Sequence, residues 1–171
     1  MSPILTASAF DVVTHSPAQT FAIGRRLGQL LKPGDVVCLE GELGTGKTCL
    51  AQGIGAGLGV IGVINSPTFV FVNEYPPAST GPCLYHVDLY RVSSYIEILG
   101  LGLEDYIYGD GVTVIEWADR AREVIPADRL WITLDYTDHM KRSLIFEASG
   151  AHYLEMVTAL RHDVHCSRQG D

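Results

Sequence analysis

The clearest pattern of apolar and polar positions lies in residues 17–31. Large aliphatic residues recur there three or four positions apart, so a helix would gather them on one face: Ile23, Leu27, Leu30 and Leu31. The preceding Ser16-Pro17-x-Gln19 supplies an N-cap serine, a proline for the first helical position and a capping-box glutamine. We therefore predict an amphipathic helix over residues 17–31, ended by Pro33-Gly34.

Runs rich in β-branched and aromatic residues follow in two pairs, each pair separated by turn-forming residues. Residues 69–75 and 84–88 flank a stretch with three prolines, and they predict one hairpin. Residues 130–136 and 144–148 predict a second hairpin in the same way.

Two further runs, residues 36–39 and 112–117, are mostly apolar and predict buried strands. Short helices are predicted between and after the strands, at residues 94–101, 103–108 and 152–160. Residues 161–171 are expected to form a loose tail on a single domain spanning 1–171. Together with the phosphate-loop motif described next, this mixture predicts an α/β fold of the P-loop NTPase type, whose sheet has a parallel core, antiparallel flanking strands and helices on both faces.

One motif links the strand at 36–39 to a glycine-rich helix at 49–58. It reads Gly41-Glu42-Leu43-Gly44-Thr45-Gly46-Lys47-Thr48 and matches G-x-x-x-x-G-K-[ST]. In such a loop, glycines let the backbone N–H groups surround a phosphate, the lysine reaches the β- and γ-phosphates, and the hydroxyl holds Mg²⁺. The order strand, loop, helix favours this interpretation over a glycine-rich turn that binds nothing. The candidate nucleotide-binding residues are Glu42, Leu43, Gly44, Thr45, Gly46, Lys47, Thr48 and Cys49.

A phosphate-loop enzyme also needs an acidic group at the end of a neighbouring strand. Val112-Thr113-Val114-Ile115-Glu116 ends an apolar strand with a carboxylate, and Leu84-Tyr85-His86-Val87-Asp88 does so less purely. Glu116, Asp88 and Thr48 are therefore candidate Mg²⁺ ligands. One acid would take the metal while the other positions the attacking water, and the sequence leaves open which does which.

Three other residues have two interpretations each. Thr68, in Asn65-Ser66-Pro67-Thr68-Phe69, could sense the γ-phosphate as a switch threonine does, or lie in a plain turn. Arg91 could stabilise phosphate charge or form a surface salt bridge. Trp117 could shape the site or only pack in the core, and packing is the more typical role of a tryptophan. Lys47, Asp88, Glu116 and Thr68 are the candidate catalytic residues.

Composition and charge limit the classes of protein to which the chain could belong. The 171-residue chain is 47% apolar, has a net charge of −8 and has no apolar run long enough to predict a membrane span. Its four cysteines lack C-x-x-C spacing and are expected to be free thiols in a cytoplasmic protein. The negative charge argues against strong nucleic-acid binding by the chain alone.

Missing motifs argue against two nucleotide-dependent classes, the GTPases and the small-molecule kinases. Neither the N-K-x-D guanine-recognition motif nor the D-x-x-G motif of GTPases occurs. The arginines are mostly dispersed, which disfavours a small-molecule kinase with an arginine-rich lid. A kinase and a nucleotide-sensing subunit that does not hydrolyse ATP stay as alternatives to an ATPase.

Taken together, these motifs resemble the TsaE (YjeE) family, the P-loop ATPases of bacterial tRNA threonylcarbamoyladenosine biosynthesis. The resemblance rests on the phosphate loop, Ser66-Pro67-Thr68-Phe69, His86-Val87-Asp88-Leu89-Tyr90-Arg91 and Glu116-Trp117, in that order. It implies an ATPase that works with TsaD and TsaB, which modify adenosine 37 of tRNA, and that meets tRNA only through them. ATP and Mg²⁺ are the implied cofactors. Slow hydrolysis by the chain alone and faster hydrolysis with the partners are expected.

Two points depart from the family pattern or lack a motif. Cys49 stands where the family commonly has a second threonine, and a thiol in the first helical turn is predicted to have a lowered pKa. Adenine contacts are not encoded in a clear motif. We expect them near Pro17 and in the loop around Lys141.

Overall fold

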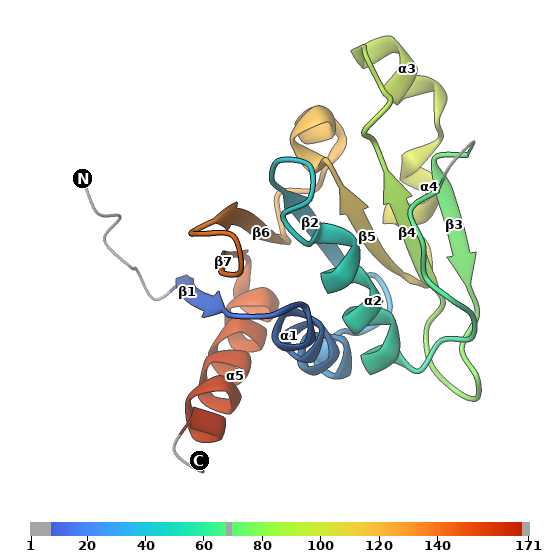
Figure 1. Ribbon diagram of the computed structural model, residues 1–171. Helices are drawn as coiled ribbons and strands as arrows, with labels where there is room; N and C mark the ends of the chain where they lie inside the picture. The colour runs from blue at the N-terminus through green and yellow to red at the C-terminus, as the bar shows by residue number, and fades with distance from the viewer. Residues whose placement is uncertain (1–7, 68–69, 169–171) are drawn as a thin grey trace.

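The computed structural model describes residues 8–67 and 70–168. Within them the strands form a single seven-stranded sheet in the order β1-β7-β6-β2-β5-β4-β3 (Figure 1). The strands are β1 (Ala9–Thr14), β2 (Val36–Glu40), β3 (Val72–Tyr75), β4 (Leu84–Asp88), β5 (Val112–Glu116), β6 (Arg129–Tyr136) and β7 (Arg142–Ser149). The helices are α1 (Pro17–Leu30), α2 (Lys47–Leu58), α3 (Tyr95–Gly100), α4 (Leu103–Ile107), the 3₁₀ segment η1 (Ala118–Val124) and α5 (Ala151–Arg168).

The sheet has the predicted parallel core and antiparallel flanks. Strands β6, β2, β5 and β4 run parallel, so their carboxyl ends meet at one edge. The β3–β4 and β6–β7 pairs are the two predicted hairpins, and β1 adds antiparallel to β7. The predicted α/β class is confirmed. Among the described residues, no helix is both long and apolar enough to cross a bilayer.

Alternate residues of the core strands face two separate layers of helices. Val37 and Leu39 of β2 pack with α1, α2 and α5, whereas Val36 and Cys38 pack with α3, α4 and η1. A strand places successive side chains on opposite faces, so a strand buried on both faces is apolar at nearly every position. Helices therefore cover both faces, as predicted (Figure 1).

Helices α1 and α2 approach so closely that glycines are required where they cross. A Cβ at Gly53 would lie 2.2 Å from the Phe21 carbonyl oxygen, and one at Gly28 would lie 2.2 Å from that of Ile54. Either side chain would overlap the backbone of the other helix. The glycine contact holds the start of α1 beside the loop that precedes α2.

Two elements were not predicted. Strand β1 pairs with β7, which is more than 120 residues away in the sequence, and Phe10 stacks on Phe146 of β7 with ring centroids 4.8 Å apart. Segment η1 follows β5 directly and buries only two small residues, Ala118 and Ala121. Contacts distant in sequence stabilise β1, and patterns along the chain do not reveal such contacts.

The expected loose tail from residue 161 is wrong as far as the described chain extends. Helix α5 continues through Arg168 instead of ending near Leu160. Val164 is buried, and the Arg26 guanidinium of α1 donates to the Asp163 carbonyl and the Ser167 hydroxyl. Packing against α1 therefore extends the helix through a polar sequence.

Candidate functional site

The phosphate loop joins β2 to α2 at the carboxyl edge of the parallel strands. Gly44 and Gly46 have φ angles of 80° and 103°, a region that side chains rarely adopt, and Gly46 is the N-cap of α2. The buried Thr45 hydroxyl donates to the Glu42 carbonyl within the loop. These turns place the loop at the amino end of a twelve-residue helix, whose free N–H groups and dipole favour an anion.

Lys47 lies inside this loop rather than in solvent. Its Nζ donates to the Gly41 and Glu42 carbonyl oxygens at 2.6 and 2.7 Å and lies 4.4 Å from the centre of the Trp117 ring. Burial lowers the pKa of the ammonium, while the nearby Glu116 and Asp88 carboxylates act in the opposite direction. A phosphate oxygen is a stronger acceptor for an ammonium than a carbonyl is.

Strand periodicity brings three polar side chains to the face that α2 covers. Glu116 has the same parity as Val114 in β5, and His86 and Asp88 have that of Leu84 in β4, so all three point toward α2. The parallel register sets Asp88 directly beside Glu116. The two predicted acids therefore lie on adjacent strands at one edge of the sheet.

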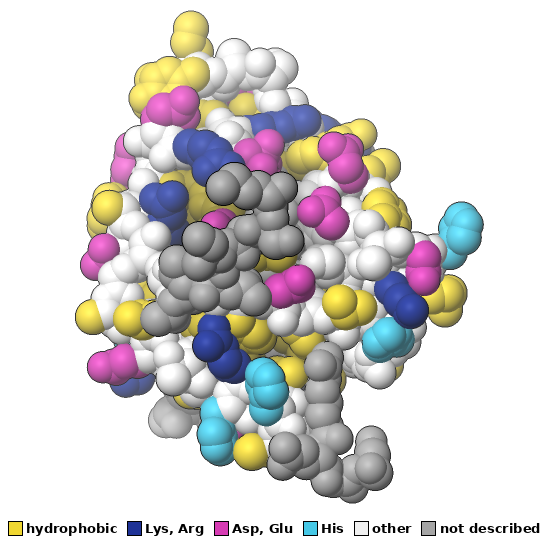
Figure 2. Space-filling model, turned by 90° about the vertical axis from the view of Figure 1, so that its left-hand side faces the viewer, with side chains coloured by type: hydrophobic (Ala, Val, Ile, Leu, Met, Phe, Trp, Pro, Cys, Tyr) yellow, Lys and Arg dark blue, Asp and Glu magenta, His cyan; other side chains and the backbone are white. Residues whose placement is uncertain are grey.

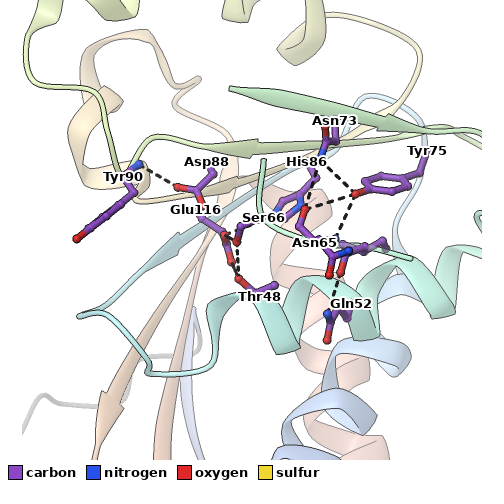
Figure 3. A network of polar contacts seen from close by, with 11 residues as sticks. Thr48, Gln52, Asn65, Ser66, Asn73, Tyr75, His86, Asp88, Tyr90 and Glu116 are labelled. Atoms are coloured by element: carbon purple, nitrogen blue, oxygen red, sulfur yellow. Dashed lines mark hydrogen bonds and ion pairs between the residues drawn. The ribbon is translucent and has the colours of Figure 1, made fainter. Parts of the chain in front are cut away.

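Glu116 is the centre of a polar network that joins three segments (Figure 3). Its Oε1 accepts a 2.8 Å hydrogen bond from Thr48 Oγ1, and its Oε2 accepts one of 3.3 Å from Ser66 Oγ. The Thr48 and Ser66 hydroxyls are themselves 2.9 Å apart. His86 Nε2 lies 3.5 Å from Glu116 Oε2, and neither ring nitrogen has a hydrogen-bond partner among the described residues.

The pKa values of the two carboxyl groups are shifted in opposite directions. Burial raises the pKa of Asp88, the backbone N–H of Tyr90 partly offsets this, and the adjacent Glu116 raises it further. Burial alone would raise the pKa of Glu116, but His86 and the Thr48 hydroxyl outweigh it and the pKa is lowered. Glu116 therefore stays ionised, and Asp88 is the first of the pair to take a proton.

The donor set at this edge fits a hard divalent cation. Two carboxylates and a hydroxyl lie together, and oxygen is the ligand that Mg²⁺ prefers. In the described part of the chain, no group of three or more His, Cys, Asp or Glu side chains could enclose a metal ion. Mg²⁺ is usually held by one or two carboxylates together with water and substrate phosphates, and Asp88 and Glu116 could supply such carboxylates.

Cavities lie on both sides of the phosphate loop. The strand-side cavity, about 530 Å³, is lined by the loop together with Ser66, Asp88, Arg91, Glu116 and Trp117. The helix-side cavity, about 190 Å³, lies between the loop, the start of α1 and the β6–β7 turn, and its lining includes Pro17, Thr20, His139, Met140 and Arg142. An elongated ligand whose anionic part lies on the loop could reach both cavities.

Comparison with known proteins decides which family carries this site. The family model described as "Threonylcarbamoyl adenosine biosynthesis protein TsaE" matches residues 14–144. The chain belongs to the TsaE family. It is 40% identical over 151 residues to the tRNA threonylcarbamoyladenosine biosynthesis protein TsaE of Bacillus subtilis, covering 88% of this chain and 93% of that protein.

Two further comparisons agree with the family assignment. The TsaE protein of Streptomyces coelicolor is 47% identical over 114 residues, covering 66% of this chain and 76% of that protein. The crystal structure of Bacillus subtilis YdiB superimposes with a TM-score of 0.77 at 35% identity, covering 91% of this chain and 96% of that one. The TsaE resemblance predicted from the motifs is confirmed, and the fold is that of a solved relative.

The structure gathers most of the predicted site residues. Lys47, Thr48, Asp88 and Glu116 meet around the strand-side cavity, and Cys49 lines it as well. Thr68, the fourth predicted catalytic residue, lies outside the described residues. Trp117 lines the cavity with its ring over Lys47, and it is the one described non-glycine residue with a positive φ, 59°.

Arg91 lines the strand-side cavity next to Tyr90. Its segment is fixed by the Arg120 guanidinium, which donates to the carbonyl oxygens of Leu89, Tyr90 and Val92. Arg91 therefore lies beside the site. Stabilisation of phosphate charge and a surface salt bridge both remain predictions for it.

The expected lowering of the Cys49 pKa is wrong. Burial raises the pKa of the thiol, and a backbone hydrogen bond only partly opposes this. The Sγ donates to the Pro17 carbonyl at 3.3 Å instead of facing the phosphate position. A position in the first helical turn did not lower the pKa, because the Cys49 side chain points toward α1.

Sequence reasoning assigned no role to Ser66 or His86. Both were part of the motifs, yet nothing in their spacing placed them on Glu116. For His86 a signal was present, because it lies two residues before Asp88 and therefore points to the same face of β4. Ser66 lies in the segment between α2 and β3, where no periodicity predicts direction.

Proposed function

We propose that this protein binds and hydrolyses Mg-ATP as the ATPase component of tRNA N6-threonylcarbamoyladenosine formation, supporting turnover of the TsaD–TsaB pair in the cytoplasm. The observation that carries the proposal is the Thr48–Glu116 hydrogen bond beside Lys47. It joins the phosphate loop to an acidic strand end, as hydrolysis at a bound triphosphate requires. The names of the relatives support the pathway.

In this proposal the phosphate loop binds the β- and γ-phosphates of ATP. Backbone N–H groups at the start of α2 would hold the β-phosphate, and Lys47 would exchange its two carbonyl acceptors for β- and γ-phosphate oxygens. The low solvent exposure of Lys47 strengthens this contact, because the charge is already partly removed from water. Thr45 and Glu42 keep the loop in shape.

Thr48, Glu116 and Asp88 are the groups that would hold Mg²⁺. When bound, the ion neutralises charge on the β- and γ-phosphates. Glu116 is fixed by Thr48 and Ser66, so its oxygens are oriented before a ligand arrives. Asp88, which has fewer hydrogen-bond partners than Glu116, would also orient the attacking water. Catalysis then comes from positioning and charge neutralisation.

The helix-side cavity would hold the adenine base of ATP. It adjoins the phosphate loop at Gly44 and Gly46 and is bounded by Pro17 and the β6–β7 turn. Of the positions expected from the sequence, Pro17 lines it, and the turn contributes His139, Met140 and Arg142 rather than Lys141.

TsaD and TsaB are the proposed partners, and tRNA would be met through them. The net charge of −8 supports this, because a polyanion would be repelled by the chain alone. On the face in Figure 2, the coloured basic and acidic side chains are interspersed rather than gathered into one basic patch. The proposed docking segments are residues 66–75 and 89–103, where exposed apolar side chains are Val70, Tyr90, Tyr95, Ile96 and Leu99.

The fate of the γ-phosphate tests the proposal against its two alternatives. ATP labelled at the γ-position is incubated with the protein, Mg²⁺, TsaD, TsaB and tRNA. An ATPase releases the label as inorganic phosphate, and Lys47→Ala prevents release. Label on an acceptor molecule would identify a kinase instead. Label retained in ATP, with ATP-dependent assembly of the complex, would identify a sensing subunit.

A further inference from the structure

Tyr136, the last residue of β6, touches the phosphate loop from outside the site described above. Its hydroxyl donates a 2.9 Å hydrogen bond to the Leu43 carbonyl oxygen. The adjacent Gly44 has a φ of 80°, and a Cβ there would lie 2.6 Å from the Tyr136 hydroxyl oxygen. A side chain at position 44 would therefore overlap the Tyr136 hydroxyl, and glycine allows this close approach.

This bond fixes the direction of one peptide group. The described chain has no cis peptide bond, so the Leu43 carbonyl and the Gly44 N–H point in opposite directions. With the carbonyl held on Tyr136, the Gly44 N–H points away from Tyr136. Rotation of this peptide would break the bond and turn the N–H with it.

Arg142 holds the Tyr136 ring in turn. Its guanidinium carbon lies 4.3 Å from the ring centre, and its NH1 donates to the carbonyl oxygens of Asp138, His139 and Lys141. Asp138 Oδ1 accepts from the Met140 and Lys141 N–H groups. The β6–β7 turn is therefore tied together internally, and the same arginine connects it to Tyr136.

The turn and the loop also share a cavity. His139, Met140 and Arg142 line the helix-side cavity together with Gly44, Thr45 and Gly46. A ligand in this cavity contacts the turn on one side and the phosphate loop on the other. Tyr136 links these two walls directly, through its hydrogen bond to Leu43 and its contact with Arg142.

We propose that Tyr136 is a positioning residue for the phosphate loop, which holds the Leu43–Gly44 peptide so that the Gly44 N–H is presented to a nucleotide phosphate. Arg142 keeps the ring in place and ties it to the turn. This inference rests on the proposed nucleotide binding. It assigns to the β6–β7 hairpin a part in phosphate binding, beyond the loop itself.

Tyr136→Phe tests the inference, because it removes the hydroxyl and keeps the ring against Arg142. Affinities for ATP, ADP and adenosine are measured by displacement of a fluorescent ATP analogue from the full chain. We expect weaker binding of ATP and ADP by about three- to tenfold, the range for one hydrogen bond, and unchanged adenosine binding. KM for ATP should rise with kcat nearly unchanged.

Tyr108→Phe is the matched control, since Tyr108 is an exposed tyrosine at the end of α4. It should leave all three affinities as in the wild type. Equal weakening of ATP and adenosine by Tyr136→Phe, or no change in ATP affinity, would overturn the positioning role while leaving ATP binding itself intact. Failure of the wild type to bind ATP would overturn the proposed function and this inference together.

Discussion

Thr48 Oγ1 donates a 2.8 Å hydrogen bond to Glu116 Oε1, joining the first turn of α2 to the end of β5. Two residues that are 68 positions apart in the sequence thereby form one site. Because burial opposes ionisation of Glu116, its charge depends on partners such as Thr48 and His86. Substitution of this acid is the most informative change within the site.

Glu116→Gln should reduce ATP hydrolysis on the order of 100-fold while sparing most ATP binding. The amide preserves the size of the side chain but removes the charge that would hold or orient the cation and its waters. Phosphate release and equilibrium binding are measured on the same preparation, with Asp88→Asn in parallel. Normal hydrolysis by Glu116→Gln together with a loss in Asp88→Asn would transfer the metal role to Asp88.

Lys47→Ala should abolish measurable ATP binding, because it removes the one side-chain cation that lies inside the phosphate loop. Calorimetric titration with Mg-ATP gives the affinity, and circular dichroism checks that the fold is retained. Arg122→Ala serves as the control, since Arg122 pairs with Glu40 and neither residue lines either cavity. An unchanged dissociation constant for Lys47→Ala would contradict phosphate binding by this loop.

Gly53→Ala should destabilise the fold by about 2–3 kcal/mol, even though alanine is normally the better helix former. The added Cβ would lie 2.2 Å from the Phe21 carbonyl oxygen, so α1 and α2 would have to separate. Gly100→Ala is the matched control, because a Cβ there meets no atom within 4 Å. Equal urea midpoints for both variants would mean that the helices tolerate a wider spacing.

Burial raises the pKa of the Cys38 thiol from about 9 to about 12, and Arg129 and Arg122 only partly oppose this. Because the folded-state pKa is the higher one, the unfolded chain loses its proton first, and the free energy of unfolding falls as pH rises from about 9 toward 12. Below pH 9 the thiol contributes no pH dependence. Tyr153, whose pKa is also raised to about 12 by burial, adds to the loss above pH 10.

Cys38→Ala should therefore lose less stability between pH 8.5 and 10.5 than the wild type, by about 2 kcal/mol at 1.4 kcal/mol per pKa unit. Urea unfolding at the two pH values gives this difference, and the cavity made by the substitution cancels because it is present at both. Parallel pH profiles for the two proteins would contradict the assigned burial effect.

Local patterns were sufficient for elements whose signals lie within a few residues. The Ser16 cap and the aliphatic spacing predicted α1, which ends at Leu30, one residue before the expected end. Both hairpins and β5 were predicted for the same reason, because apolar strands bounded by turn residues are visible in the sequence.

Features that depend on distant contacts were not predictable in this way. Strand β1 depends on β7, and the extension of α5 depends on Arg26 of α1. The Cys49 prediction failed because the direction of one side chain depends on the neighbouring helix.

The predictions for the site residues succeeded or failed for the same reasons. The phosphate-loop motif identified Lys47 and Thr48, and the strand ends identified Asp88 and Glu116, since each signal is local. The partners of Glu116 come from separate segments, so Ser66 and His86 could be quoted from motifs without a role. Tyr136 was predicted only as the last residue of a hairpin strand, and the fold places it on Leu43.

Phosphate release from Mg-ATP, measured for the protein alone and then with TsaB and TsaD, tests the central claim most directly. We predict slow release by the protein alone, stimulation by the pair, and loss of both in Lys47→Ala. Release that is fast in the protein alone and unaffected by TsaB and TsaD, or that persists in Lys47→Ala, would contradict a partner-dependent ATPase acting through this loop.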